Sequence, residues 1–118
     1  MACGSHARPI QRPRIPIWVG GNLALGKVRR RVATWDGSCA YCRSADGNEI
    51  LPHQVRQLRD QVREQSDGDR PFDIKISGSD DPELINALEE AGATWWSRWL
   101  DPNDPARLRR VIDQGPPR

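Results

Sequence analysis

Four segments of the chain have the hydrophobic pattern of short β-strands. Residues 72–77 alternate strictly between apolar and polar side chains, which is typical of a strand with one buried face. The apolar run at 15–19 ends at two glycines and predicts a buried strand with a proline near its start. Residues 33–37 and 93–96 are interpreted as two further short strands, the first of which enters a turn at Gly37.

A helical pattern follows each predicted strand. Pro52 suits the first turn of the second helix, and residues 81–83 offer the third helix an N-cap, a proline and an acid near its positive end. Residues 104–105 open the last helix in the same way, and we expect its apolar residues to face inward. The predicted buried faces have apolar residues three and four positions apart: Leu25, Val28 and Val32; Val55, Leu58 and Val62; Leu84, Ile85, Leu88 and Ala91; and Leu108, Val111 and Ile112.

The order of these elements predicts the fold class. Strands that alternate with helices favour an α/β fold in which right-handed crossovers join parallel strands. About four such units are too few to close an eight-stranded barrel, which takes about 250 residues. The sheet is therefore expected to stay open, to pair with another copy, or to be a fragment with a raw edge. Residues 1–14 are rich in Arg and Pro and predict an irregular lead-in to one domain at 15–118.

Composition narrows the class of protein without assigning a function. The 118 residues are 36% hydrophobic and 29% charged, as in a soluble domain with a modest core. A net charge of +2 does not indicate a nucleic-acid partner, and the arginine run at 29–31 is interpreted as a solvated helix face. No segment resembles a membrane span, and residues 1–9 lack the apolar core of a signal peptide. We therefore expect a cytoplasmic protein with reduced cysteines.

Gly20, Gly21 and Asn22 lie where the first predicted strand passes into the first predicted helix. A glycine pair lets the backbone approach a ligand without an intervening Cβ, and free N–H groups at a helix start attract anions. Asn22 is interpreted either as a cap for the helix or as a donor to a phosphate oxygen. The alternative is a plain tight turn, which the spacing alone favours.

A family resemblance changes that balance. Residues 12–22, Arg-Pro-Arg-Ile-Pro-Ile-Trp-Val-Gly-Gly-Asn, resemble a stretch of the bacterial luciferase-like monooxygenases, the strand after which the phosphate of FMN or a deazaflavin is gripped. Residues 33–37 resemble the family's next strand, which ends in Asp-Gly, and 71–78 resemble the following one. Residues 80–96 resemble the helix and last strand that close the barrel, and the whole resemblance covers residues 9–118.

The resemblance implies a fold, a cofactor and a site. The fold is an incomplete TIM (β/α)8 barrel corresponding to its C-terminal half, and the activity is that of an oxidoreductase or monooxygenase using FMN or the deazaflavin F-420. Its cofactor-binding residues would be Gly20, Gly21 and Asn22. The two glycines are expected at the same end of the sheet as Asp36 and Gly78.

The same resemblance implies that part of the domain is missing. The family's first four strands, which supply the ring pocket and the usual catalytic residues, have no counterpart here, so no catalytic residue is assigned. We expect a truncated gene product, a decayed copy or a separate subunit, inactive alone. Its partner would be a missing N-terminal half or a second copy.

Cysteine spacing supports an alternative hypothesis. Cys39 and Cys42 form a C-x-x-C pair, Cys3 and His6 have the same spacing, and His53 lies nearby in sequence. With Cys3, His6, Cys39 and Cys42 as four ligands, the chain would be a small non-enzymatic α/β interaction protein stapled by zinc. There is no second C-x-x-C, however, so two free loop cysteines and no metal site are predicted.

Two further groups of residues are interpreted as structural. The acids at 80–83 are predicted to cap a helix and not to perform acid–base chemistry, because a proline and an apolar run accompany them. Trp95, Trp96 and Trp99 are predicted to pack in the core and not to stack on a ligand ring. On a strand, Trp95 and Trp96 point to opposite faces.

Overall fold

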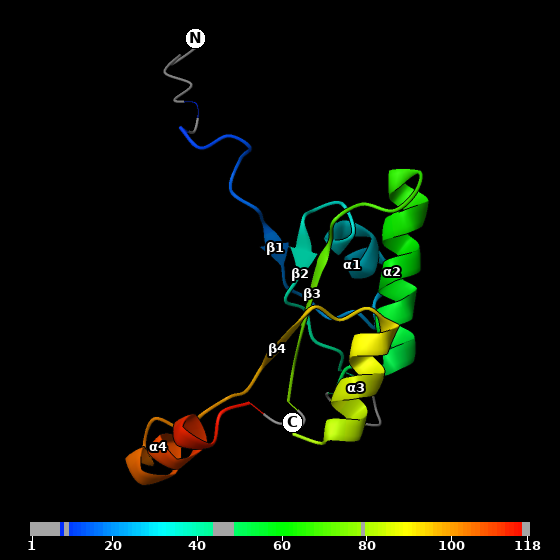
Figure 1. Cartoon of the computed structure of the whole chain (residues 1–118). Helices are drawn as coiled ribbons and strands as arrows, with labels where there is room; N and C mark the ends of the chain where they lie inside the picture. The colour runs from blue at the N-terminus through cyan, green and yellow to red at the C-terminus, as the bar shows by residue number, and fades with distance from the viewer. Residues whose placement is uncertain (1–7, 9, 44–48, 79, 117–118) are drawn as a thin grey trace.

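The computed structural model describes residues 8, 10–43, 49–78 and 80–116. Strands and helices alternate along the chain, so the predicted α/β class is confirmed (Figure 1). Their bounds in chain order are β1 (Trp18–Val19), α1 (Gly26–Val32), β2 (Gly37–Ser38), α2 (Pro52–Ser66), β3 (Asp73–Ser77), α3 (Pro82–Ala91), β4 (Trp95–Ser97) and α4 (Pro105–Gln114).

The four strands form one parallel sheet in sequence order. Each strand pairs with its neighbours along the chain, in the order β1-β2-β3-β4. Figure 1 shows α1, α2 and α3 on the same side of this sheet, whereas α4 lies apart from them beyond the end of β4. The sheet is therefore wound in one direction, with helices on one face only.

The hydrophobic core lies between the sheet and these three helices. Ile74 and Ile76 of β3 are almost fully buried there, and Leu58 of α2 is completely so. Period-two alternation places the other residues of β3, Asp73, Lys75 and Ser77, on the opposite face. The core thus covers one face of the sheet, and no helix of the described residues packs on the other face.

Helix starts follow the predicted chemistry. The carboxylate of Asp81 accepts a hydrogen bond from the Glu83 backbone N–H at 3.0 Å, which confirms capping for this acid. Asp104 accepts from the Arg107 N–H at 3.0 Å at the start of α4. The pattern therefore predicts the starts of α3 and α4 correctly. The expectations for α1 are wrong, because Leu25 is its N-cap residue and is 48% exposed instead of buried, and no described side chain, that of Asn22 included, caps this helix.

The predicted strand at 33–37 is wrong in its position. Thr34 continues the end of α1 instead, because its hydroxyl donates to the Arg31 carbonyl at 2.7 Å. The Trp35 N–H donates to the Val32 carbonyl at 3.2 Å. The strand β2 begins only at Gly37, so β-branched and aromatic residues here serve a helix end.

The inward orientation predicted for α4 is also wrong. No residue of α4 is buried, and Ile112 is 63% exposed. The reason is the path of the preceding segment, which carries the chain past the end of β4 and away from α3 (Figure 1). An ion pair of 2.7 Å between Arg98 and Asp80 holds the start of that segment beside the loop that leads into α3.

The prediction of core packing is confirmed for one of the three C-terminal tryptophans. Trp96 is partly buried and packs against the core, whereas Trp95 and Trp99 are 56% and 78% exposed. The prediction that Trp95 and Trp96 point to opposite faces is confirmed in that only Trp96 joins the core. The core interpretation is wrong for Trp95 and Trp99, because β4 is an edge strand and the chain leaves the sheet after it.

Candidate functional site

The carboxyl ends of the four strands lie at one edge of the sheet because all four are parallel. Gly20 and Gly21 follow β1 at this edge, and Gly78 follows β3, so their shared position is confirmed. Asp36 lies at the opposite edge, because β2 begins after it, and that part of the expectation is wrong. The carboxyl edge is where ligand sites of α/β sheets and barrels form.

Gly21 brings the chain into close contact with α1. Its φ is +141°, and a Cβ there would lie 2.6 Å from the Cγ1 of Val28 and 3.4 Å from the Nη2 of Arg31. Only glycine combines a positive φ, which residues with a side chain rarely adopt, with such a close approach to a helix. Close packing thus requires this glycine, and it places the Arg31 guanidinium beside the loop.

Gly20 has open space where a side chain would be. It is exposed, and a Cβ there would meet only the Sγ of Cys39, at an ordinary 3.9 Å. Among the hydrogen bonds that the described residues form, none uses the backbone N–H of Gly20 or Gly21, whereas the Gly21 carbonyl accepts from the Tyr41 N–H at 3.0 Å. Within the described residues, these two successive N–H groups at the carboxyl edge therefore have no acceptor.

The side chain of Asn22 is used within the protein. Its Oδ1 accepts from the backbone N–H of Ala24 at 3.1 Å and of Arg43 at 3.0 Å. Its Nδ2 donates to the Arg43 carbonyl at 3.3 Å. The amide thus ties the loop after β1 to the loop after β2, which makes Asn22 a positioning residue for Gly20 and Gly21.

The carboxylate of Asp36 is paired at the other edge. Its Oδ2 accepts from the Ile17 backbone N–H at 2.7 Å, and both of its oxygens contact the Arg14 guanidinium. These hydrogen bonds, first from Arg14 and then from Ile17, lower the pKa of Asp36 below its ordinary value. The ion pair ties the lead-in to the start of β2.

The sheet face opposite the helices has a tryptophan pair that sequence reasoning did not single out. We call this the open face, and its residues are Trp18, Gly37, Asp73, Lys75 and Trp95. The rings of Trp18 and Trp95 meet edge to face with centroids 5.6 Å apart. A Cβ at Gly37 would lie 2.6 Å from the Cδ1 of Trp18, so this glycine leaves the space that the ring crosses. Strand alternation was the available signal, but it does not reveal a contact between two edge strands.

The cysteine pair does not converge on one point. Cys39 is exposed and Cys42 is buried, as expected for positions three apart in an extended segment. The Sγ of Cys42 accepts a hydrogen bond from the Nε2 of Gln54 at 2.7 Å. Cys3 and His6 lie outside the described residues. Among the residues described, no three metal-binding side chains gather.

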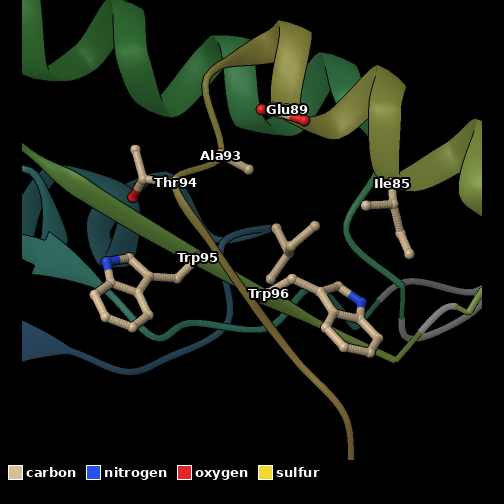
Figure 2. A pocket seen from close by; sticks show the side chains of 7 residues that line it. Ile85, Glu89, Ala93, Thr94, Trp95 and Trp96 are labelled. Atoms are coloured by element: carbon tan, nitrogen blue, oxygen red, sulfur yellow. The ribbon is translucent and has the colours of Figure 1, made fainter. Parts of the chain in front are cut away.

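A cavity of about 210 Å³ lies between α3 and β4, on the helical side of the sheet (Figure 2). Ile85 and Glu89 of α3 line it together with Ile76 of β3 and residues 93–96. Because β1 and β4 are the two outer strands, the Gly20 loop lies beside one outer strand of the sheet and this cavity beside the other.

Comparison with protein-family models, with curated proteins and with solved structures finds no match for this chain. Within the described part of the chain, no helix has the length and apolar character needed to cross a membrane. The functional assignment therefore depends on the geometry of the carboxyl edge and the open face.

Proposed function

We propose that the chain is a partial luciferase-like oxidoreductase domain that binds the phosphate of FMN or of deazaflavin F-420 at Gly20 and Gly21. The observation that best supports the proposal is the winding of the sheet. Four parallel strands in sequence order with α1, α2 and α3 on one face are the arrangement of consecutive units of a β/α barrel (Figure 1). In such barrels the ligand lies at the carboxyl ends of the strands.

The two glycine N–H groups are the donors in this proposal. They follow a strand directly, and their hydrogen atoms have no acceptor among the described residues. Arg31 adds a positive charge beside Gly21, and Asn22 holds the loop in place. Backbone N–H groups and a guanidinium together suit a phosphate dianion.

The space around the loop is consistent with a phosphate at Gly20. A side chain at this position would occupy the side from which a ligand approaches. At Gly21, in contrast, the space that a Cβ would need is filled by side chains of α1. The ring of a flavin or deazaflavin supplies the redox chemistry when bound. The open face beside the loop offers Trp18 and Trp95 as flat apolar surfaces for a planar ring.

We expect the chain alone to bind the cofactor weakly and to show no turnover. The donors described above contact only the anionic tail, while the resemblance attributes the ring pocket to strands that have no counterpart in this sequence. A cytoplasmic protein that acts with a missing half or with a second copy fits this division.

Titration of the isotope-labelled chain followed by NMR tests the proposal. FMN is expected to shift the amide signals of Gly20 and Gly21, and riboflavin, which lacks the phosphate, is expected to leave them unchanged. Equal shifts with both compounds, or shifts elsewhere only, would refute a phosphate site. Tight FMN binding or turnover would refute the incomplete ring pocket.

A matched pair of variants separates the site from a general charge effect. Gly20→Asp places a negative charge on the proposed phosphate position and has room for its side chain, so it should abolish the FMN shifts. Gln57→Glu adds the same charge on the exposed face of α2 and should leave the titration unchanged. Similar titrations for both variants would contradict the assignment.

A second candidate function is that of a non-enzymatic interaction protein. The observation that favours it is α4, an amphipathic helix with no buried residue. A zinc staple through Cys39 and Cys42 is the weaker version, because these two thiols face opposite sides of the chain. Elemental analysis of the purified protein tests that version, which requires bound zinc.

A further inference from the structure

Two apolar surfaces are only partly covered by the described residues, and they match one another. The first is α4, whose apolar residues Leu108, Val111 and Ile112 form a stripe along one side and are at most partly buried. The second is the cavity between α3 and β4 (Figure 2). We propose that α4 of a second copy of this chain occupies this cavity, so that two chains exchange their α4 helices reciprocally. This inference is independent of the proposed cofactor site.

The position of the cavity is that of a missing helix. In a sheet wound in one direction, each crossover helix packs beside the previous helix and above the next strand. The groove between α3 and β4 is the next such position after α1, α2 and α3, and its walls are apolar apart from Glu89 and Thr94. Figure 2 shows Ile85 of α3 and Trp96 of β4 on either side of it. Its shape and lining thus suit an amphipathic helix.

Charge complementarity identifies α4 as the occupant. The helix α3 has three glutamates and no basic residue, whereas α4 has three arginines and one aspartate. At 100° per residue, Arg107 and Arg109 border the apolar stripe of α4, and Arg110 lies on the far side. Among the described residues, Glu89 at the cavity forms no ion pair, and neither do Arg107 and Arg109.

The path of the chain favours exchange between two copies. Residues 98–104 carry α4 away from its own α3, and the Arg98–Asp80 ion pair directs the start of this segment past the sheet (Figure 1). A helix displayed at the end of such an arm can reach the groove of a second copy, and the second copy's helix can reach the first. Exchange of an identical element is a low-cost route to a symmetric dimer.

Charge reversal in full-length chains tests the inference by mixing. The first variant carries Glu89→Arg, and the second carries both Arg107→Glu and Arg109→Glu. In a homodimer of either variant, like charges meet wherever α4 docks beside residue 89. Sedimentation velocity should show that the wild-type protein is a dimer. In a homodimer of either variant, the dissociation constant of the dimer should be raised about tenfold for each docked helix. An equimolar mixture should recover a dimer of nearly wild-type affinity, because each groove then meets a helix of opposite charge.

Matched controls reverse charges away from the proposed contact. Glu90→Arg on α3 and Arg110→Glu on α4 alter exposed residues that do not face the cavity or the stripe, and they should leave the dimer unchanged. All of the substituted residues are exposed, so circular dichroism should remain that of the wild type.

Three results would overturn the inference. A wild-type protein that stays monomeric at all accessible concentrations excludes the second copy as the occupant. Failure of the mixture to recover the dimer shows that α4 docks on its own chain or elsewhere. A dimer that resists Glu89→Arg and dissociates with Trp18→Lys, a substitution on the open face and outside the cavity lining, is formed by the open face instead.

Discussion

Substitution of Gly21 by alanine tests whether the loop after β1 packs on α1 as closely as the structure describes. The new Cβ would lie 2.6 Å from the Cγ1 of Val28, against a comfortable carbon–carbon separation of about 3.5–4.0 Å. The backbone would also keep a φ of +141°, which side-chain-bearing residues rarely adopt. Both effects act in the folded state only, so they lower the free energy of unfolding.

The two contributions have similar sizes. Holding a residue in a sparsely populated backbone region lowers the free energy of unfolding by about 1–3 kcal/mol. Overpacking by one methyl group costs about 1–3 kcal/mol when the neighbour is a buried side chain, and Val28 is only 9% exposed. We therefore expect Gly21→Ala to destabilise the protein by about 2–6 kcal/mol, a large share of the stability of a small domain.

Urea unfolding monitored by tryptophan fluorescence measures this loss. The five tryptophans give a strong signal, and Gly20→Ala is the matched control, because its Cβ would meet only the Cys39 Sγ at 3.9 Å. The control should change the free energy of unfolding by about 0.5 kcal/mol or less. Equal losses in the two variants would refute the close approach at Gly21. Recovery of part of the loss by Val28→Ala would confirm that steric overlap contributes.

Three further predictions concern the rest of the molecule. Arg59→Ala should lower the free energy of unfolding by about 2–3 kcal/mol, because the half-buried guanidinium donates to the Gly92 carbonyl at the end of α3, which a urea titration will measure. Asp36→Asn should destabilise the protein at neutral pH by an amount that disappears in acid. The folded-state pKa of Asp36 is lowered by Arg14, so its stabilisation is complete above the unfolded pKa of about 3.9 and is lost as the pH falls through the folded value. In a Cys3→Ser background, a thiol reagent should label Cys39 rapidly in the native protein.

Each of these predictions has a control within the chain. Arg56→Ala removes an exposed arginine of the same helix and should have little effect, so an equal loss would contradict the role of Arg59. A wild-type minus Asp36→Asn difference in stability that does not shrink as the pH falls below the unfolded pKa of about 3.9 would contradict the ion pair. Cys42 should react only after unfolding, because it is buried beneath Gln54, and equal labelling of the two thiols would contradict its burial.

Local chemistry was sufficient for the starts of α3 and α4 and for β3. It was not sufficient for the buried strand predicted at 15–19, because β1 spans only Trp18–Val19, and Ile15 and Ile17 are 62% and 40% exposed. Proline at the first helical position and an aspartate just before it define the starts of α3 and α4 in sequence and in structure alike. Strict alternation at 72–77 predicts β3 almost to the residue, since one face of that strand is buried and the other is not. These features depend on neighbours within a few positions, which a sequence displays directly.

Positions at the sheet margins were harder to predict. Residues 33–36 have the composition of a strand, but tertiary structure uses them to end α1, and the strand β2 is reduced to two residues. The amphipathic stripe of α4 predicts burial without stating against what, so a helix free of core contacts reads the same as a packed one. A periodic pattern predicts which face of a helix is apolar. The path of the whole chain decides which element packs against that face.

The sequence by itself determined the α/β class, the four strand–helix units and the position of the glycine pair after the first strand. Only the tertiary structure decided that Gly21 packs on α1, that the Asn22 amide is used to join two loops, and that Trp18 meets Trp95 across the open face. The physical reason is range. Backbone preferences and side-chain periodicity act over a few residues, whereas these contacts join residues brought together only when the parallel sheet has formed.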